Sequence, residues 1–125
     1  MTSLRLAGVL VLIGCSSTTA PTVGDGIQRL DAPAIYRTWY SEVKACSGLT
    51  GNYDALTLRT ATNIAVGNDV FSGYWTPPHT ITIRFETVWL YDETLIKHEF
   101  LHDVLQRGDH PAQYFNGVCG NLLIQ

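Results

Sequence analysis

The chain has 125 residues, the length of a single domain, and carries a net charge of −3 from 8 basic and 11 acidic residues. A mildly acidic chain without a run of lysine or arginine is a poor match for a phosphate backbone, so nucleic acid is excluded as an expected partner. Nothing in the composition indicates a repeat or a second domain.

The first fifteen residues, MTSLRLAGVLVLIGC, predict an export signal. One cation, Arg5, precedes an apolar run that extends from residue 6 to 13. Ten residues of helix cover about 15 Å, roughly half of a bilayer's hydrocarbon core, so a signal is favoured over a membrane span. The run ends in LIGC, which resembles the lipobox of bacterial lipoproteins. This resemblance implies a signal peptide over residues 1–14 and an acylated Cys15, whereas a plain secretory signal with a stray or buried Cys15 is the alternative.

Residues 15–30 are small, polar and rich in glycine and proline, and they predict a flexible tether. A tether of this length reaches about 20–25 Å on average, enough to hold a small domain clear of a membrane. We therefore expect an exported protein that is lipid-anchored to the bacterial cell envelope membrane, with its domain over residues 31–125.

The segment LDAPAIYRTWYSEVKACSG predicts the first helix. Asp31 is placed as an N-cap, Pro33 suits a first turn, and Gly48 is a typical C-terminal stop. Apolar residues at helical spacing predict one buried stripe, formed by Ile35, Trp39, Val43 and Cys46.

Two cysteines, Cys46 and Cys119, remain once Cys15 is assigned to lipid. An even pair in an exported protein predicts a disulfide, because the compartment is oxidising. Two buried free thiols are the alternative.

Two segments alternate apolar and polar residues and predict strands, ALTLRTA at 55–61 and TITIRF at 80–85. The intervening residues 63–79 are rich in glycine, asparagine and proline and predict mostly loop, with a short extended piece near Val70. TVWLY, at 87–91, predicts either a short strand or the lead-in to the next helix. The order of helix, strands and helix predicts an α+β fold.

The last predicted helix begins at Asp92 or Thr94 and ends near Gly108. It contains the motif H-E-x-x-H. Four residues advance a helix by about 400°, so His98 and His102 lie about 40° apart on one face, one turn from each other. Both can reach one Zn²⁺, while Glu99 lies beside the metal as a candidate general base.

A catalytic zinc needs a third protein ligand and an open position for water. The downstream candidates are Asp103, Asp109 and His110. Asp103 projects about 100° away from the metal face, because it follows His102 by one residue. Asp109 and His110 lie beyond the predicted helix end and are free to turn back. His110 is preferred because imidazole matches the two other ligands, and Asp109 is the alternative.

The segments HEFLH and GDHP resemble the zincin metallopeptidases, and TITIRF resembles the edge strand that borders the cleft in those enzymes. With the lipobox and the helix ending in CSG, the chain is also similar to a group of small bacterial lipoproteins that share an HExxH…GDHP stretch. It departs from the metzincin pattern H-E-x-x-H-x-x-G-x-x-H, because Leu105 stands in place of the glycine and Gly108 in place of the third histidine. The resemblance implies a small zincin-like domain, with a few-stranded sheet packed on an N-terminal helix and an active-site helix.

The implied function is zinc-dependent hydrolysis of a peptide or protein substrate. Zn²⁺ would polarise the peptide carbonyl and a water, and Glu99 would pass a proton from that water to the leaving amine. TITIRF would pair with an extended substrate by β-addition. Tyr114 is expected to pack with Phe115 near Cys119, and a role as donor to the oxyanion is the alternative. His79 is expected to be a loop residue. The alternative function is a non-catalytic envelope lipoprotein in which the zinc is structural or absent.

Overall fold

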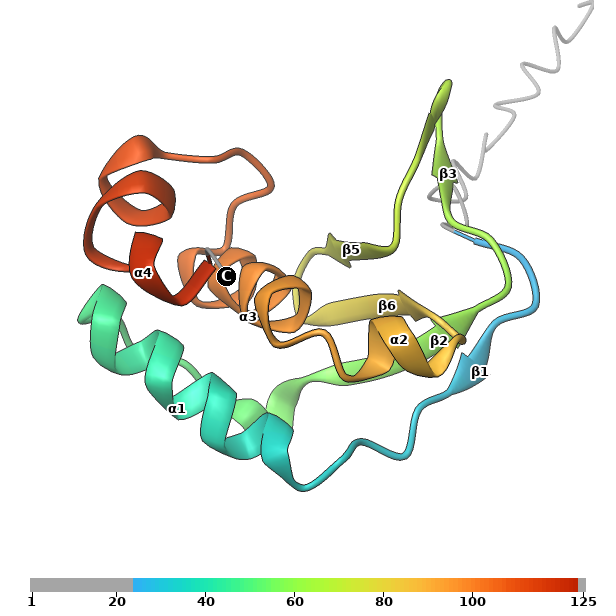
Figure 1. The fold of residues 1–125 in the computed structure, drawn as a ribbon, viewed down its shortest axis with the longest axis horizontal. Helices are drawn as coiled ribbons and strands as arrows, with labels where there is room; N and C mark the ends of the chain where they lie inside the picture. Colours follow the sequence, from blue (N-terminus) through green and yellow to red (C-terminus); the bar gives the residue numbers. More distant parts are fainter. Residues whose placement is uncertain (1–23, 124–125) are drawn as a thin grey trace, which may run out of the picture.

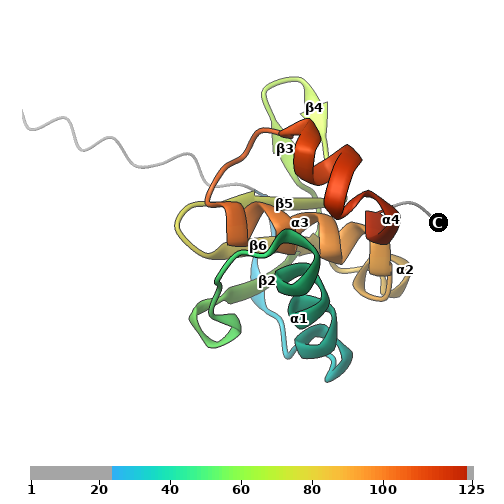
Figure 2. The ribbon, with the colours of Figure 1, turned by 90° about the vertical axis from the view of Figure 1, so that its left-hand side faces the viewer.

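The computed structural model describes residues 24–123, so the predicted signal peptide and Cys15 lie outside the described residues. The fold is α+β, as predicted, with α1 and α3 on the same side of a four-stranded sheet (Figures 1 and 2). Within residues 24–123, no helix has the length and apolar character needed to cross a bilayer. The elements in chain order are β1 (Gln28–Arg29), α1 (Ile35–Ser47), η1 (Tyr53–Ala55), β2 (Thr57–Ala61), β3 (Ala65–Val66), β4 (Asp69–Val70), β5 (Gly73–Thr76), β6 (Thr80–Arg84), α2 (Thr87–Leu90), α3 (Glu93–Leu105), η2 (Gln113–Val118) and α4 (Gly120–Leu123).

The folded domain begins before residue 31, which corrects the predicted boundary of the tether. Asp25 forms an antiparallel bridge with Asn63, and β1 pairs with β2 in an antiparallel register. Both residues of β1 are exposed, and a strand of two residues has no periodicity. Its conformation comes from pairing with β2, so the sequence pattern did not indicate it.

Helix α1 begins at Ile35, later than predicted. Ala34 is the N-cap and has no side-chain cap, so Asp31 does not take that role. The backbone N–H of Tyr36 donates to the Pro33 carbonyl (3.0 Å), which starts the helix at the proline and leaves Asp31 outside it. Gly48 ends the helix at φ 69°, as predicted, because glycine adopts the left-handed conformation without a steric penalty.

The buried face of α1 is rotated from the predicted stripe. Ile35 is 40% exposed, whereas Tyr36 and Tyr40 are 0% and 1% exposed. Trp39 and Val43 are buried as predicted. Tyr36 and Tyr40 each meet Phe100 of α3 edge to face, with ring centroids 5.8 and 5.2 Å apart. Aromatic pairs of this geometry stabilise beyond the area that they bury, and they fix how α3 lies against α1.

The sheet has the strand order β1-β2-β6-β5. Strand β6 runs parallel to β2 and antiparallel to β5, so it is paired on both sides. Its residues Ile81, Thr82 and Ile83 are all buried. The expectation that TITIRF is an edge strand available to a substrate is therefore wrong, because its hydrogen-bonding groups are already used on both edges.

The segment 63–79 contains more strand than predicted. It forms the β3–β4 hairpin, which extends away from the main sheet (Figure 1), and then β5, the true edge strand beside α3. Gly73 opens β5 and is buried, with little room for a side chain: a Cβ there would lie 3.1 Å from Leu95 and 3.2 Å from Glu99. The glycine, a poor strand former, thus suits the close approach of β5 to α3.

The short segment 87–91 is helical, as α2, and leads into α3. Asp92 caps α3, since its side chain accepts a hydrogen bond from the backbone N–H of Leu95 at 2.9 Å. The helix ends at Leu105 and not near Gly108. Gln106 takes the left-handed C-cap at φ 54°, and its side-chain amide donates to the carbonyls of Asp103 (2.7 Å) and Pro78 (2.8 Å). These two hydrogen bonds offset the strain of a positive φ in a residue with a side chain.

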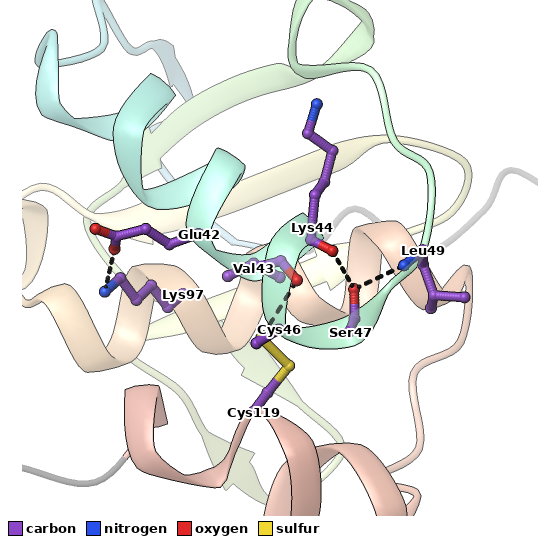
Figure 3. The surroundings of a disulfide bond; sticks show 8 residues. All are labelled: Glu42, Val43, Lys44, Cys46, Ser47, Leu49, Lys97 and Cys119. Atoms are coloured by element: carbon purple, nitrogen blue, oxygen red, sulfur yellow. Dashed lines mark hydrogen bonds and ion pairs between the residues drawn. A yellow bond between two sulfur atoms is a disulfide. The ribbon is translucent and has the colours of Figure 1, made fainter.

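Cys46 and Cys119 form a disulfide that joins the end of α1 to the segment before α4 (Figure 3). Beside it, the buried ammonium group of Lys97 on α3 pairs with Glu42 of α1 at 2.5 Å and with Glu93 of its own helix. The disulfide holds the C-terminal segment against α1, and the Lys97–Glu42 ion pair holds α3 against α1. The predicted pairing of Cys46 with Cys119 is present in the structure.

Removing the disulfide should destabilise the domain. A Cys46→Ser, Cys119→Ser double variant should lose about 4 kcal/mol of unfolding free energy, because the bond closes a loop with a sequence separation of 73 and restricts the unfolded chain. Urea unfolding of the oxidised protein and the double variant measures the difference. Equal unfolding free energies would mean that the C-terminal segment is held by packing alone.

Candidate metal centre and cleft

Three histidines converge at one point on the surface of α3. His98 and His102 come from successive turns of the helix, and His110 returns to them from the segment after it. The Nε2 atom of His98 lies 3.0 Å from Nε2 of His110 and 3.2 Å from Nε2 of His102. One ligand atom from each of the three lies within 4.8 Å of the others, so the cluster can hold a metal ion.

The tautomer of His102 is fixed by the backbone. Its Nδ1 atom lies 2.8 Å from the carbonyl oxygen of Arg107, and a carbonyl can only accept. The proton is therefore on Nδ1, and the lone pair of Nε2 faces the cluster. A backbone partner of this kind orients metal-ligating histidines and raises their basicity.

The surroundings of the cluster favour neutral imidazoles. Burial, with the neighbouring His102 and His110, lowers the pKa of His98 to about 4. Burial also lowers the pKa of His102. Deprotonated nitrogens are the form that binds a metal, so these two ligands need not lose a proton at neutral pH before one binds.

The two other predicted candidates for the third ligand are engaged elsewhere. Both carboxylate oxygens of Asp109 accept from the guanidinium of Arg107, at 2.8 and 2.6 Å. Asp103 points into the protein, as its position after His102 predicted, and lies 1% exposed at its side chain. His110 is the candidate that joins His98 and His102. The chain turns back after Gln106, earlier than predicted, which brings His110 to the cluster.

Asp103 forms a buried hydrogen-bond network behind the cluster. Its carboxylate accepts from the hydroxyl of Tyr40 (2.8 Å), from Nε1 of Trp75 (3.2 Å) and from Nδ1 of His79 (2.9 Å). The Trp75 ring is in turn stacked on His102, with centroids 6.3 Å apart. His79 lies in a loop as predicted, but its partner is a buried carboxylate. The network joins residues from four separate segments of the chain, so no local sequence pattern predicted it.

Glu99 lies in the same cleft as the histidines. The cleft has a volume of about 260 Å³ and is lined by β5 on one side and by Glu99 and the three histidines on the other. Burial raises the pKa of Glu99 to about 8, although a hydrogen bond from the backbone of Trp75 lowers it in part. A buried carboxylate with a raised pKa in a cleft is typical of a catalytic group.

Phe115 forms the floor of the histidine cluster. Its ring centroid lies 5.0 Å from His98, 5.0 Å from His102 and 4.8 Å from His110. It is 7% exposed and belongs to η2, four residues before Cys119 of the disulfide. Its contact with all three histidines was not predicted, because nothing in the sequence distinguishes it from neighbouring aromatic residues. Tyr114 packs against the main core that contains Phe115 and Cys119, as predicted, and it is not among the residues that line the cleft, where the alternative role of oxyanion donor would place it.

Phe115 should matter for metal binding. In Phe115→Ala the imidazoles lose the apolar surface that orients them, and zinc affinity should fall by about 10- to 100-fold, the usual effect of losing a partner behind the ligands. Competition with a chromophoric chelator measures the affinity. Tyr114→Ala, which truncates the adjacent aromatic residue, should keep the wild-type affinity. If folded Phe115→Ala binds zinc as tightly as wild type, the floor has no positioning role.

A scan against protein-family models, a search of curated proteins and a search of solved structures find no match to this chain.

Proposed function

We propose that the protein is a zinc-dependent metallopeptidase. The observation that carries the proposal is the convergence of three imidazole nitrogens beside a buried glutamate in one cleft. Zn–N distances of about 2.0–2.1 Å in a tetrahedron place ligand nitrogens about 3.3 Å apart. The two measured separations, 3.0 and 3.2 Å, are close to that value. Three imidazoles suit zinc, and a cleft beside them leaves room for a water and a substrate.

The chain's own residues have distinct roles in this proposal. A bound Zn²⁺ would supply Lewis-acid chemistry, polarising a peptide carbonyl and acidifying a water. Glu99 takes the proton of the attacking water and passes it to the leaving amine. Its burial makes it a stronger base than an exposed glutamate, and a cation held by the three histidines lowers its pKa again towards neutrality. The backbone of Trp75 partly offsets the effect of burial on the pKa of this carboxyl.

Strand β5 takes the role in substrate binding that the sequence had indicated for TITIRF. The N–H of Arg84 donates to the Ser72 carbonyl at 2.9 Å, so the alternation of an antiparallel ladder directs the backbone groups of Gly73 and Trp75 away from β6. The Trp75 N–H is directed to Glu99. Gly73 lines the cleft, and its outward backbone groups would pair there with an extended peptide beside Glu99.

The domain would be zincin-like, with an edge strand antiparallel to its neighbour that borders the helix carrying H-E-x-x-H. We further propose that it is an exported lipoprotein anchored to the cell envelope membrane through Cys15. The LIGC segment supports this proposal, and so does the disulfide, which suits an oxidising compartment.

His110 should be needed for metal binding. His110→Ala leaves two protein ligands, and zinc affinity should fall by at least about 100-fold, more than the loss of an outer partner costs. Asp109→Asn is the matched control, because it changes the adjacent residue, which pairs with Arg107. Metal content after dialysis against zinc buffers measures both. Zinc retained by His110→Ala and lost by Asp109→Asn would assign the third ligand to Asp109.

Glu99 should be needed for hydrolysis and not for metal binding. The amide in Glu99→Gln fits the same space, and burial already disfavours a charge there, so the fold and bound zinc should be kept. Cleavage should fall by at least about 100-fold, because no base receives the water's proton. A mass-spectrometric digest of a peptide library, with zinc content measured in parallel, tests this. Equal cleavage by wild type and Glu99→Gln would refute the mechanism.

A further inference from the structure

A second cavity opens next to the cleft of the histidines. It has a volume of about 450 Å³ and lies between the β4–β5 segment and the start of α3. Its walls are mainly apolar: Val70, Phe71, Trp89 and Leu95. We call this cavity the side pocket. Its volume lies within the range of about 300–1,000 Å³ that is usual for ligand sites.

We propose that the side pocket receives a bulky apolar side chain of a peptide substrate, from the residue next to the bond that is cut. This inference rests on the proposed peptidase function and names its substrate class. The side pocket and the cleft share four lining residues, Phe71, Gly73, His98 and Glu99. A peptide that places its scissile bond beside Glu99 therefore places a neighbouring side chain at the mouth of the side pocket.

The close packing at Gly73 connects the two spaces. Because Gly73 has no side chain, β5 lies close to Glu99 and Leu95 of α3: a Cβ added to Gly73 would lie 3.1 Å from Leu95 and 3.2 Å from Glu99. The side chains of a peptide paired with the outer edge of β5 alternate between the two faces of the sheet. Every second side chain therefore points to the face on which α3 lies. The side pocket lies on this path, between β5 and the first turn of α3.

The charges around the side pocket favour an apolar occupant over a charged one. No lysine or arginine stands among the described residues that line it, so an acidic side chain would find no partner there. Asp92 lines the pocket, but its carboxylate accepts from the N–H of Leu95 at the positive end of α3. A lysine would also have to lose water against the apolar walls, which opposes its entry.

Peptides that differ at one position test the inference. A series with phenylalanine, leucine, alanine, lysine or glutamate on either side of a common cleavage site is digested by the full, zinc-loaded chain. Cleavage, as kcat/KM, should be about 10- to 100-fold faster for phenylalanine or leucine than for alanine, because the pocket buries the extra apolar surface. Glutamate should be the poorest substrate. Equal rates across the series would overturn the side-pocket assignment and leave the peptidase function standing.

A pair of variants locates the effect. Val70 and Val88 are both 66% exposed, but Val70 lines the side pocket and Val88 does not. Relative to the alanine peptide, Val70→Glu should reduce cleavage of the phenylalanine peptide about 10-fold and raise cleavage of the lysine peptide. Val88→Glu should leave the whole series unchanged. An equal loss in both variants, or no change in Val70→Glu, would place the preference elsewhere.

A binding measurement separates failure of this inference from failure of the peptidase function. Calorimetry with zinc-loaded Glu99→Gln compares the phenylalanine and alanine peptides without turnover. Tighter binding of the phenylalanine peptide, lost in the Val70→Glu background, supports the side pocket even if wild type cuts neither peptide, in which case only the peptidase function fails. Equal binding of the two peptides counts against the side pocket whatever the cleavage result.

Discussion

The carboxylate of Asp103 joins the helix of the histidines to the rest of the domain. It is buried beside His102 and accepts hydrogen bonds from α1, from β5 and from the loop after β5, through Tyr40, Trp75 and His79. A buried carboxylate is costly unless such donors surround it, so each of these segments is held to one position relative to α3. The positions of the edge strand and of the histidine cluster thus depend on the same turn of α3.

The cleft itself departs from what stability alone would favour. Glu99 is buried, and Nε2 of His98 lies within hydrogen-bonding distance of both His102 and His110. Burial and mutual repulsion oppose charge on His98 and lower its pKa, and burial opposes charge on Glu99 and raises its pKa. A cation in the cluster would favour both the neutral imidazoles and the glutamate anion. Groups whose energetic costs one bound cation would relieve are typical of a functional site.

The local parts of this site followed from the sequence, and the parts built across the fold did not. His98, Glu99 and His102 have fixed relations because helical spacing is a local property, and the disulfide followed from cysteine number and the expected compartment. Strand β5 begins with a glycine and owes its conformation to β6 and α3, so its local sequence resembled a loop. The contacts of Phe115 are equally non-local. The predicted helix end at Gly108 was wrong because the side chain of Gln106 stabilises an earlier turn through contacts with Pro78, 28 residues away.

The distribution of stabilising contacts bears on whether a metal would be structural or catalytic. Small domains without a sufficient core commonly need a metal to fold. Here the main core joins α1, α3, β5 and β6 through tyrosine, phenylalanine and isoleucine side chains, and the disulfide attaches the C-terminal segment to α1 independently of the histidines. Phe115, held four residues before Cys119, then supports the cluster from below. Because the core and the disulfide join these elements through contacts that do not involve the three histidines, and because the cluster faces a cleft, a zinc bound there could keep an open position for a substrate.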